Sequence, residues 1–138
     1  MKKQDEIANP LQNLHTQRVE YNIFLVENRG EEPLVRDTHT LINLLSHLYI
    51  RCSCKQMILK REDIGSDFMN LSTGLARKLL EKCIEYRFIF AILGEREAYV
   101  GPEWARLIQE FESTGKMLFA STLQEAHQFL FNVDEDLL

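Results

Sequence analysis

The residues best suited to metal chemistry are Cys52 and Cys54, with Cys83 and His47 elsewhere in the chain. Thiolate sulfur and imidazole nitrogen are the usual ligands of zinc. On a continuous helix, however, Cys52 and Cys54 point about 200° apart, because each residue turns by about 100°. Paired zinc ligands usually have two or more residues between them. We therefore expect no metal site, and core packing explains Cys52 and Cys83, which fall on apolar helix faces.

No other arrangement of residues indicates catalysis. The four histidines, at positions 15, 39, 47 and 127, fall in different segments and have no ligand spacing. The sequence contains no Ser-His-Asp pattern, no paired carboxylates and no phosphate-binding loop. We therefore expect neither enzymatic activity nor a cofactor.

The composition is that of an ordinary globular domain of 138 residues, with 45% hydrophobic and 27% charged residues. No apolar run reaches the roughly 20 residues that would span a membrane. The two N-terminal lysines are not followed by the apolar region of a signal peptide. The three cysteines fit a reducing compartment. The sequence thus predicts a cytoplasmic protein with no membrane partner.

The charge is unevenly distributed along the chain. The net charge is −5 for the whole chain, but residues 55–87 carry seven basic and five acidic side chains. Residues 88–138 carry three basic and nine acidic side chains. Phosphate contacts supply most of the affinity of a protein for nucleic acid, so only the middle segment is a candidate for facing DNA.

Apolar residues with helical spacing predict several helices. The first begins at Asp37 or Thr38 and ends near Cys54, with an inward face that includes Tyr49. A short second helix covers residues 61–68. Ser72 caps a third helix, whose inward stripe is predicted to be Leu75, Ala76, Leu79, Leu80, Cys83 and Ile84.

Extended segments are predicted before and after these helices. Residues 21–26 are β-branched and aromatic, as is typical of a strand. Residues 88–93 and 98–100 are apolar runs on either side of a polar turn that contains Gly94, so we expect them to pair as a hairpin. Pro102 then begins a helix with Trp104 on its apolar side.

Helix, helix, turn, helix and hairpin is the order of a winged helix-turn-helix. Residues 63–65 and 72–77 carry the pattern of the turn and of the third, recognition helix. The segment from residue 38 to 111, including Gly101-Pro102-Glu103-Trp104-Ala105, resembles the MarR family of bacterial transcription regulators. The resemblance implies an α+β winged-helix fold with a hairpin wing. It also implies a homodimer that binds double-stranded DNA through two recognition helices.

The same resemblance implies a set of DNA-contacting residues. Position in the pattern assigns base or phosphate contacts to Thr73, Arg77 and Lys78, and a phosphate contact to Ser72. Arg96 occupies the tip of the wing, and Lys55 and Lys60 flank the second helix. These residues are expected to form one basic interface. The alternative for Arg77 and Lys78 is a solvated helix face with local ion pairs, and the alternative for Arg96 is a solvated charge in the turn.

The chain divides into three predicted segments. Residues 1–36 form an N-terminal extension, residues 37–112 the winged-helix domain, and residues 113–138 a C-terminal amphipathic helix. The helix carries Leu123, Ala126, Phe129, Leu130 and Val133 on one face. We expect the terminal segments to form the homodimer contact, including Leu123, Phe129, Leu130 and Val133 of this helix. The alternative is that these residues fold back onto residues 21–26 of the same chain.

Two functions remain open from the sequence. The first is a dimeric DNA-binding transcription regulator. The second is a winged-helix module that binds another protein and does not bind DNA, since fold alone does not decide between these roles. Any small-molecule effector, protein partner, operator or regulated process is left open.

Overall fold

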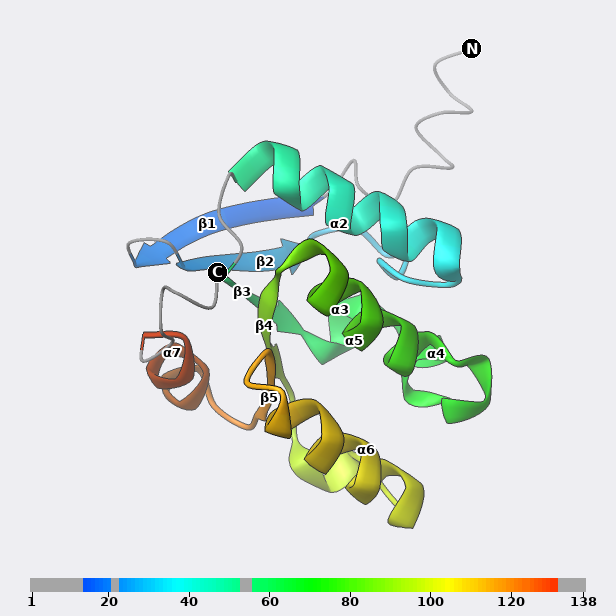
Figure 1. Ribbon diagram of the computed structural model, residues 1–138. Coiled ribbons are helices and arrows are strands. Elements are labelled where there is room, and N and C mark those ends of the chain that lie inside the picture. Colours follow the sequence, from blue (N-terminus) through cyan, green and yellow to red (C-terminus); the bar gives the residue numbers. More distant parts are fainter. Residues whose placement is uncertain (1–13, 21–22, 53–55, 132–138) are drawn as a thin grey trace.

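The described part of the protein is built on one mixed sheet of five strands in chain order, β1-β2-β3-β4-β5 (Figure 1). The computed structural model describes residues 14–20, 23–52 and 56–131. The strands are, in order, β1 (Leu14–Glu20), β2 (Ile23–Asn28), β3 (Gln56–Lys60), β4 (Ile89–Leu93) and β5 (Met117–Ala120). β1 pairs with β2 antiparallel, and the other three pairings are parallel. The fold is therefore α+β with a mixed sheet.

Helices make the crossovers that parallel strands require. α2 (Thr38–Cys52) joins β2 to β3. Three short helices, α3 (Arg61–Ile64), α4 (Ser66–Met69) and the 3-10 turn η2 (Leu71–Thr73), precede α5 (Leu75–Tyr86), which leads into β4. A 3-10 turn η3 (Arg96–Ala98) and α6 (Pro102–Ser113) lie between β4 and β5, and α7 (Leu123–Phe131) follows β5.

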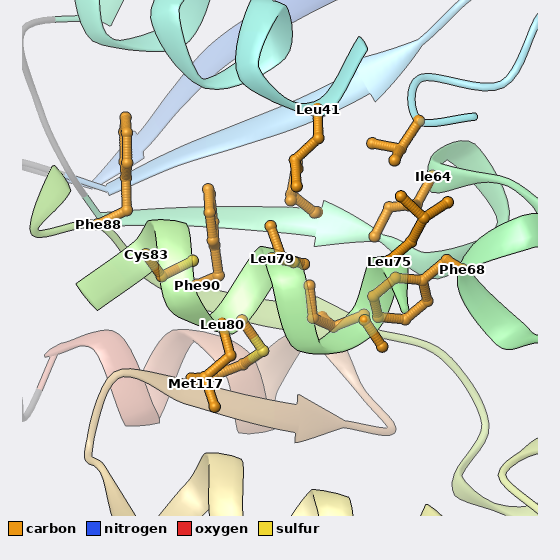
Figure 2. Packing of buried hydrophobic residues seen from close by; sticks show 14 of the residues in the cluster. Leu41, Ile64, Phe68, Leu75, Leu79, Leu80, Cys83, Phe88, Phe90 and Met117 are labelled. Atoms are coloured by element: carbon orange, nitrogen blue, oxygen red, sulfur yellow. The ribbon is translucent and has the colours of Figure 1, made fainter. Parts of the chain in front are cut away.

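The sheet has a hydrophobic cluster on each face. On one face, side chains of α2, α5 and α6 pack with alternate residues of the strands, among them Met57 and Leu59 of β3. Figure 2 shows part of this cluster, where Leu41 of α2, Leu79 of α5 and Phe90 of β4 meet. On the other face, Ala126 and Leu130 of α7 pack against Ile23, Ile58, Ile89, Ala91 and Ala120. The chain thus forms three layers with the sheet in the middle.

Several predicted elements are confirmed. α2 and α6 lie where helical spacing placed them, and α6 begins with the expected proline. The strand expected at residues 21–26 is β2 over its described part. α7 is the predicted final helix, and the Thr122 hydroxyl oxygen accepts from the Glu125 amide at its start.

The predicted wing is wrong. Residues 88–93 do contain a strand, β4, but it pairs in parallel with β5 and with β3, not with residues 98–100. The turn η3 covers Arg96–Ala98, and Val100 lies outside any strand with 77% of its surface exposed. The sheet is therefore not typical of a winged helix. β1 and β2, which precede residues 37–112, share this one sheet with them, as does β5, which follows them.

Two predicted helices also need correction, one in its continuity and the other in its cap. The helix expected at residues 61–68 is broken into α3 and α4 at Gly65. Ser72 does not cap α5, because it lies within η2, where its amide and hydroxyl both donate to the Asn70 side-chain oxygen. The residue directly before α5 is Gly74, which has a left-handed backbone conformation.

The C-terminal helix is partly buried within its own chain. Ala126 and Leu130, two residues of the face predicted to make the homodimer, are buried against the sheet. This is close to the alternative in which the helix folds back, although it packs on β3, β4 and β5 as well as β2. Leu123 remains 49% exposed. Val133 lies outside the described residues.

Gly65 allows the chain to bend between α3 and α4, and its replacement tests this packing. Its φ is +123°, and an added Cβ would lie 2.6 Å from the Pro33 Cβ and 3.2 Å from the Val35 carbonyl oxygen. We expect Gly65→Ala to lower the free energy of unfolding by about 3 kcal/mol, from backbone strain and overpacking together. Gly74→Ala is the matched control, because a Cβ there meets nothing within 4 Å. Its left-handed backbone costs about 1 kcal/mol. Urea unfolding measures both, and equal losses would contradict this packing.

Candidate interaction surface

The residues predicted to contact DNA are held by partners within the chain. On α5, the Arg77 guanidinium donates two parallel hydrogen bonds to the Glu110 carboxylate of α6, at 2.8 and 3.1 Å. This contact lowers the pKa of the Glu110 carboxyl below its usual value. Lys78 lies 3.4 Å from Glu81 on the same helix. The exposed side of α5 therefore presents neutralised pairs and not a basic stripe.

Two predicted contacts outside α5, Arg96 and Lys60, are also paired. Arg96 of η3 forms an ion pair with Glu112 of α6 at 3.0 Å. Lys60 of β3 donates to Glu27 of β2 at 2.9 Å, which raises the pKa of the lysine and lowers that of the glutamate. Because side chains alternate along a strand, Lys60 is on the same face as Ile58, which packs against α7. It therefore lies across the sheet from α5.

Two further predicted contacts have local roles or lie outside the described chain. The Thr73 hydroxyl donates to backbone oxygens of Asp67 and Asn70 and accepts from the Leu75 amide. Thr73 thus closes the turn that leads into α5. Lys55 lies outside the described residues, as does Cys54 of the CxC pattern. The structure brings Ser72, Thr73, Arg77 and Lys78 together around the start of α5, but it does not join Lys60 to them.

The described residues give no metal site and no membrane-crossing helix. Among them, no group of three His, Cys, Asp or Glu side chains is placed to hold a metal ion. Cys83 is completely buried in the core, and this burial raises the pKa of its thiol well above its usual value. Within the described ranges, no helix has the length and apolar character that a bilayer requires.

An apolar groove lies between the C-terminal ends of α2 and α5. Its volume is about 670 Å³, within the range of ligand and partner sites. The lining residues are Leu45, Ser46, Tyr49, Ile50, Glu85, Tyr86, Arg87 and Phe88, and we call them together the α2–α5 surface. Leu45 and Phe88 are each only 1% exposed. They form an apolar floor beneath more exposed side chains.

The rim of the groove exposes large apolar side chains to solvent. Ile50 is 78% exposed, Tyr49 55% and Tyr86 37%. Two of these residues belong to α2 and the third to the last turn of α5, so the folded chain gathers them from distant positions. Single exposed apolar residues are common, but a group around an apolar groove is typical of a docking site.

The backbone at the end of α5 is unusual at Arg87. Its φ of 63° and ψ of 35° place it in the left-handed region, which helices normally give to glycine at this position. The Arg87 amide donates to the Cys83 carbonyl and closes the helix. The side chain is exposed, and the described residues offer it no ion pair. The α2–α5 surface thus combines an apolar floor with an exposed cation that has no ion pair among the described residues.

Helical spacing does not reveal this surface, because the spacing of apolar residues does not show what each helix covers. Tyr49 and Ile84 were both predicted to point inward. Both predictions are wrong, because Tyr49 is 55% exposed and Ile84 is 49% exposed. The available signal was the width of the apolar stripe. Tyr49 and Ile50 extend the apolar side of α2 beyond the residues that a sheet can bury.

The comparison with protein families identifies the chain directly. The model of the family described as a domain of unknown function, DUF4180, matches residues 20–130. The chain belongs to the DUF4180 family. The match includes β2 to β5 and α2 to α6, so both sides of the α2–α5 surface lie inside the DUF4180 domain. The family result gives no support to the resemblance to MarR regulators.

Two other comparisons found nothing. No curated protein matches the chain, and no solved structure matches it.

The burial of Cys83 predicts that its thiol resists alkylation. The thiolate is the form that reacts. The raised pKa of Cys83 disfavours formation of the thiolate, and the surrounding packing keeps the reagent from reaching the sulfur. We expect iodoacetamide to leave Cys83 unmodified in the native protein at mildly alkaline pH and to modify it after urea unfolding. Peptide mass spectrometry measures the extent of labelling. Native labelling at the rate of the unfolded chain would contradict the burial of α5 on the sheet.

Proposed function

We propose that this protein is a protein-interaction module whose docking site is the α2–α5 surface. The observation that carries the proposal is Ile50, which is 78% exposed on the rim of a groove floored by buried Leu45 and Phe88. Solvent-exposed apolar side chains around an apolar depression gain free energy when a partner covers them. This role corresponds to the second function left open by the sequence, without the wing.

The ion pairs described above also favour this role over DNA binding. A protein gains affinity for DNA by replacing counterions at phosphates with free lysines and arginines. Here Arg77, Lys78 and Arg96 already face carboxylates. A phosphate would have to displace those carboxylates, and the acid side chains would remain near it.

DNA binding nevertheless stays a prediction with its own measurement. Arg77 and Lys78 remain on the exposed side of α5, and exposed ion pairs exchange readily with other partners. If α5 contacts DNA, duplex DNA binds at low salt and Arg77→Ala weakens that binding. The proposed interaction role predicts the opposite result. Fluorescence anisotropy with sheared duplex DNA should then show the same weak binding for the native protein and for Arg77→Ala, with no added dependence on salt.

Site-directed photo-crosslinking tests the interaction surface. A photo-reactive phenylalanine analogue replaces Ile50 in one variant and Val100 in a matched control. Both native side chains are highly exposed, at 78% and 77%, but Val100 does not line the groove. We expect a discrete adduct from position 50, none from position 100, and loss of the adduct when Tyr86→Asp is added.

The same experiment identifies the result that would overturn the proposal. Equal adducts from positions 50 and 100 would mean that exposed apolar residues capture neighbours without specificity. Absence of any adduct from position 50 in the cell of origin would contradict the assignment of this surface. Circular dichroism of each variant verifies that the fold is retained.

A further inference from the structure

The α2–α5 surface contains both a projection and a depression of matching chemistry. Ile50 extends into solvent from the last turns of α2, and the apolar groove floored by Leu45 and Phe88 lies beside it. A surface with these two features is able to pack against a copy of itself, with the Ile50 side chain of each copy against the apolar groove of the other. Such an arrangement is the two-fold interface most common among homodimers.

The charges on the groove are self-complementary as well. Glu85 and Arg87 line the same groove with opposite signs. Glu85 has a neighbour within its own helix, Lys82, at 3.0 Å, whereas the described residues give Arg87 no ion pair. In a two-fold interface every contact occurs twice, because the same two residues also meet with the two copies exchanged. Pairing Arg87 with Glu85 of the other copy therefore forms two identical ion pairs.

We propose that the occupant of the α2–α5 surface is a second copy of this chain, related by a two-fold axis. The proposal rests on the proposed function, because it names the partner of the same docking site. Ile50 of each copy enters the groove of the other, and Arg87 of each faces Glu85 of the other. The left-handed backbone at Arg87 fits this role, because a glycine would satisfy the helix end equally well but would carry no charge.

This assignment moves the homodimer contact away from the C-terminal helix. Ala126 and Leu130 of α7 are buried on the sheet and have no surface to offer a partner. The α2–α5 surface lies on the other side of the sheet, where the apolar rim remains uncovered within the described chain. On α7, Leu123 and Phe131 remain exposed, whereas the α2–α5 surface brings Tyr49, Ile50 and Tyr86 together around one apolar groove.

A charge-exchange experiment tests the proposed pairing. Sedimentation velocity measures the dimer dissociation constant of the full chain and of Glu85→Arg, Arg87→Glu and the double variant. Each single change places like charges opposite each other twice, so we expect the dissociation constant to rise by about tenfold or more. The double variant restores opposite charges in reversed positions and should return to within about threefold of the original value.

A second variant keeps the test decisive if a charge change disturbs the helix end. Ile50 is largely exposed, so Ile50→Ser should fold normally and raise the dissociation constant by about tenfold. Val100→Ser is the matched control and should leave the dissociation constant unchanged. Failure of the double variant to recover, with all variants folded, would overturn the Glu85–Arg87 pairing.

The mass of the crosslinked adduct separates this inference from the proposed function. A position-50 adduct of twice the chain mass, with a concentration-dependent dimer, supports both. An adduct with a different protein, from a chain that sediments as a monomer at roughly 200 µM, would overturn the second copy and leave the docking surface intact. A monomer with no position-50 adduct would overturn both.

Discussion

The structure depends on the burial of β3 from both sides. Met57 and Leu59 contact the cluster formed with α2 and α5, whereas Ile58 contacts the cluster formed with α7. Each of these three side chains is no more than 1% exposed. A strand with apolar residues on both faces needs a strand on each edge and a layer of helices above and below. The β2-β3-β4 pairing and the three-layer arrangement both satisfy this requirement.

That constraint also fixes where α2 and α5 end. Each helix returns the chain to the start of a parallel strand, so both helices finish near the end of the sheet at which β3 and β4 begin. Their inward faces are used by the sheet, which buries Leu41, Leu45 and Leu79. Apolar residues near the helix ends, such as Ile50 and Tyr86, project past this contact. The groove between them is therefore a consequence of the same packing that stabilises the core.

Much of the helical part of the fold could be predicted from the sequence, and the pairing of strands could not. Helical spacing gave α2, α6 and α7 because each has a distinct apolar face. The hairpin was predicted from two apolar runs around Gly94, yet the same pattern also fits a strand followed by a turn into a helix. The difference is visible in β4, where four successive residues are buried. Such a run is typical of a parallel strand covered on both faces, and an edge hairpin alternates.

The candidate site was harder to predict than the fold. Counting positions assigned Tyr49 to the core, whereas exposure of its side chain follows from what lies opposite α2, which only the tertiary structure determines. Arg77 of α5 was recognised as a basic residue, but its partner Glu110 lies 33 residues further along the chain. No local pattern indicates that contact. Charge counted by segment therefore overstated how basic the exposed side of α5 is.

The pairing of β4 with β5 decides between the open sheet and a hairpin, because the open sheet determines which helix faces are exposed. Nuclear Overhauser contacts between backbone protons measure that pairing. We expect backbone contacts between Ala91 and Leu118 and between the residues that flank them. The register is parallel and runs from Phe90 opposite Met117 to Leu93 opposite Ala120. Contacts between residues 88–93 and residues 98–100 in an antiparallel pattern would show that the hairpin forms in place of the β4–β5 pairing.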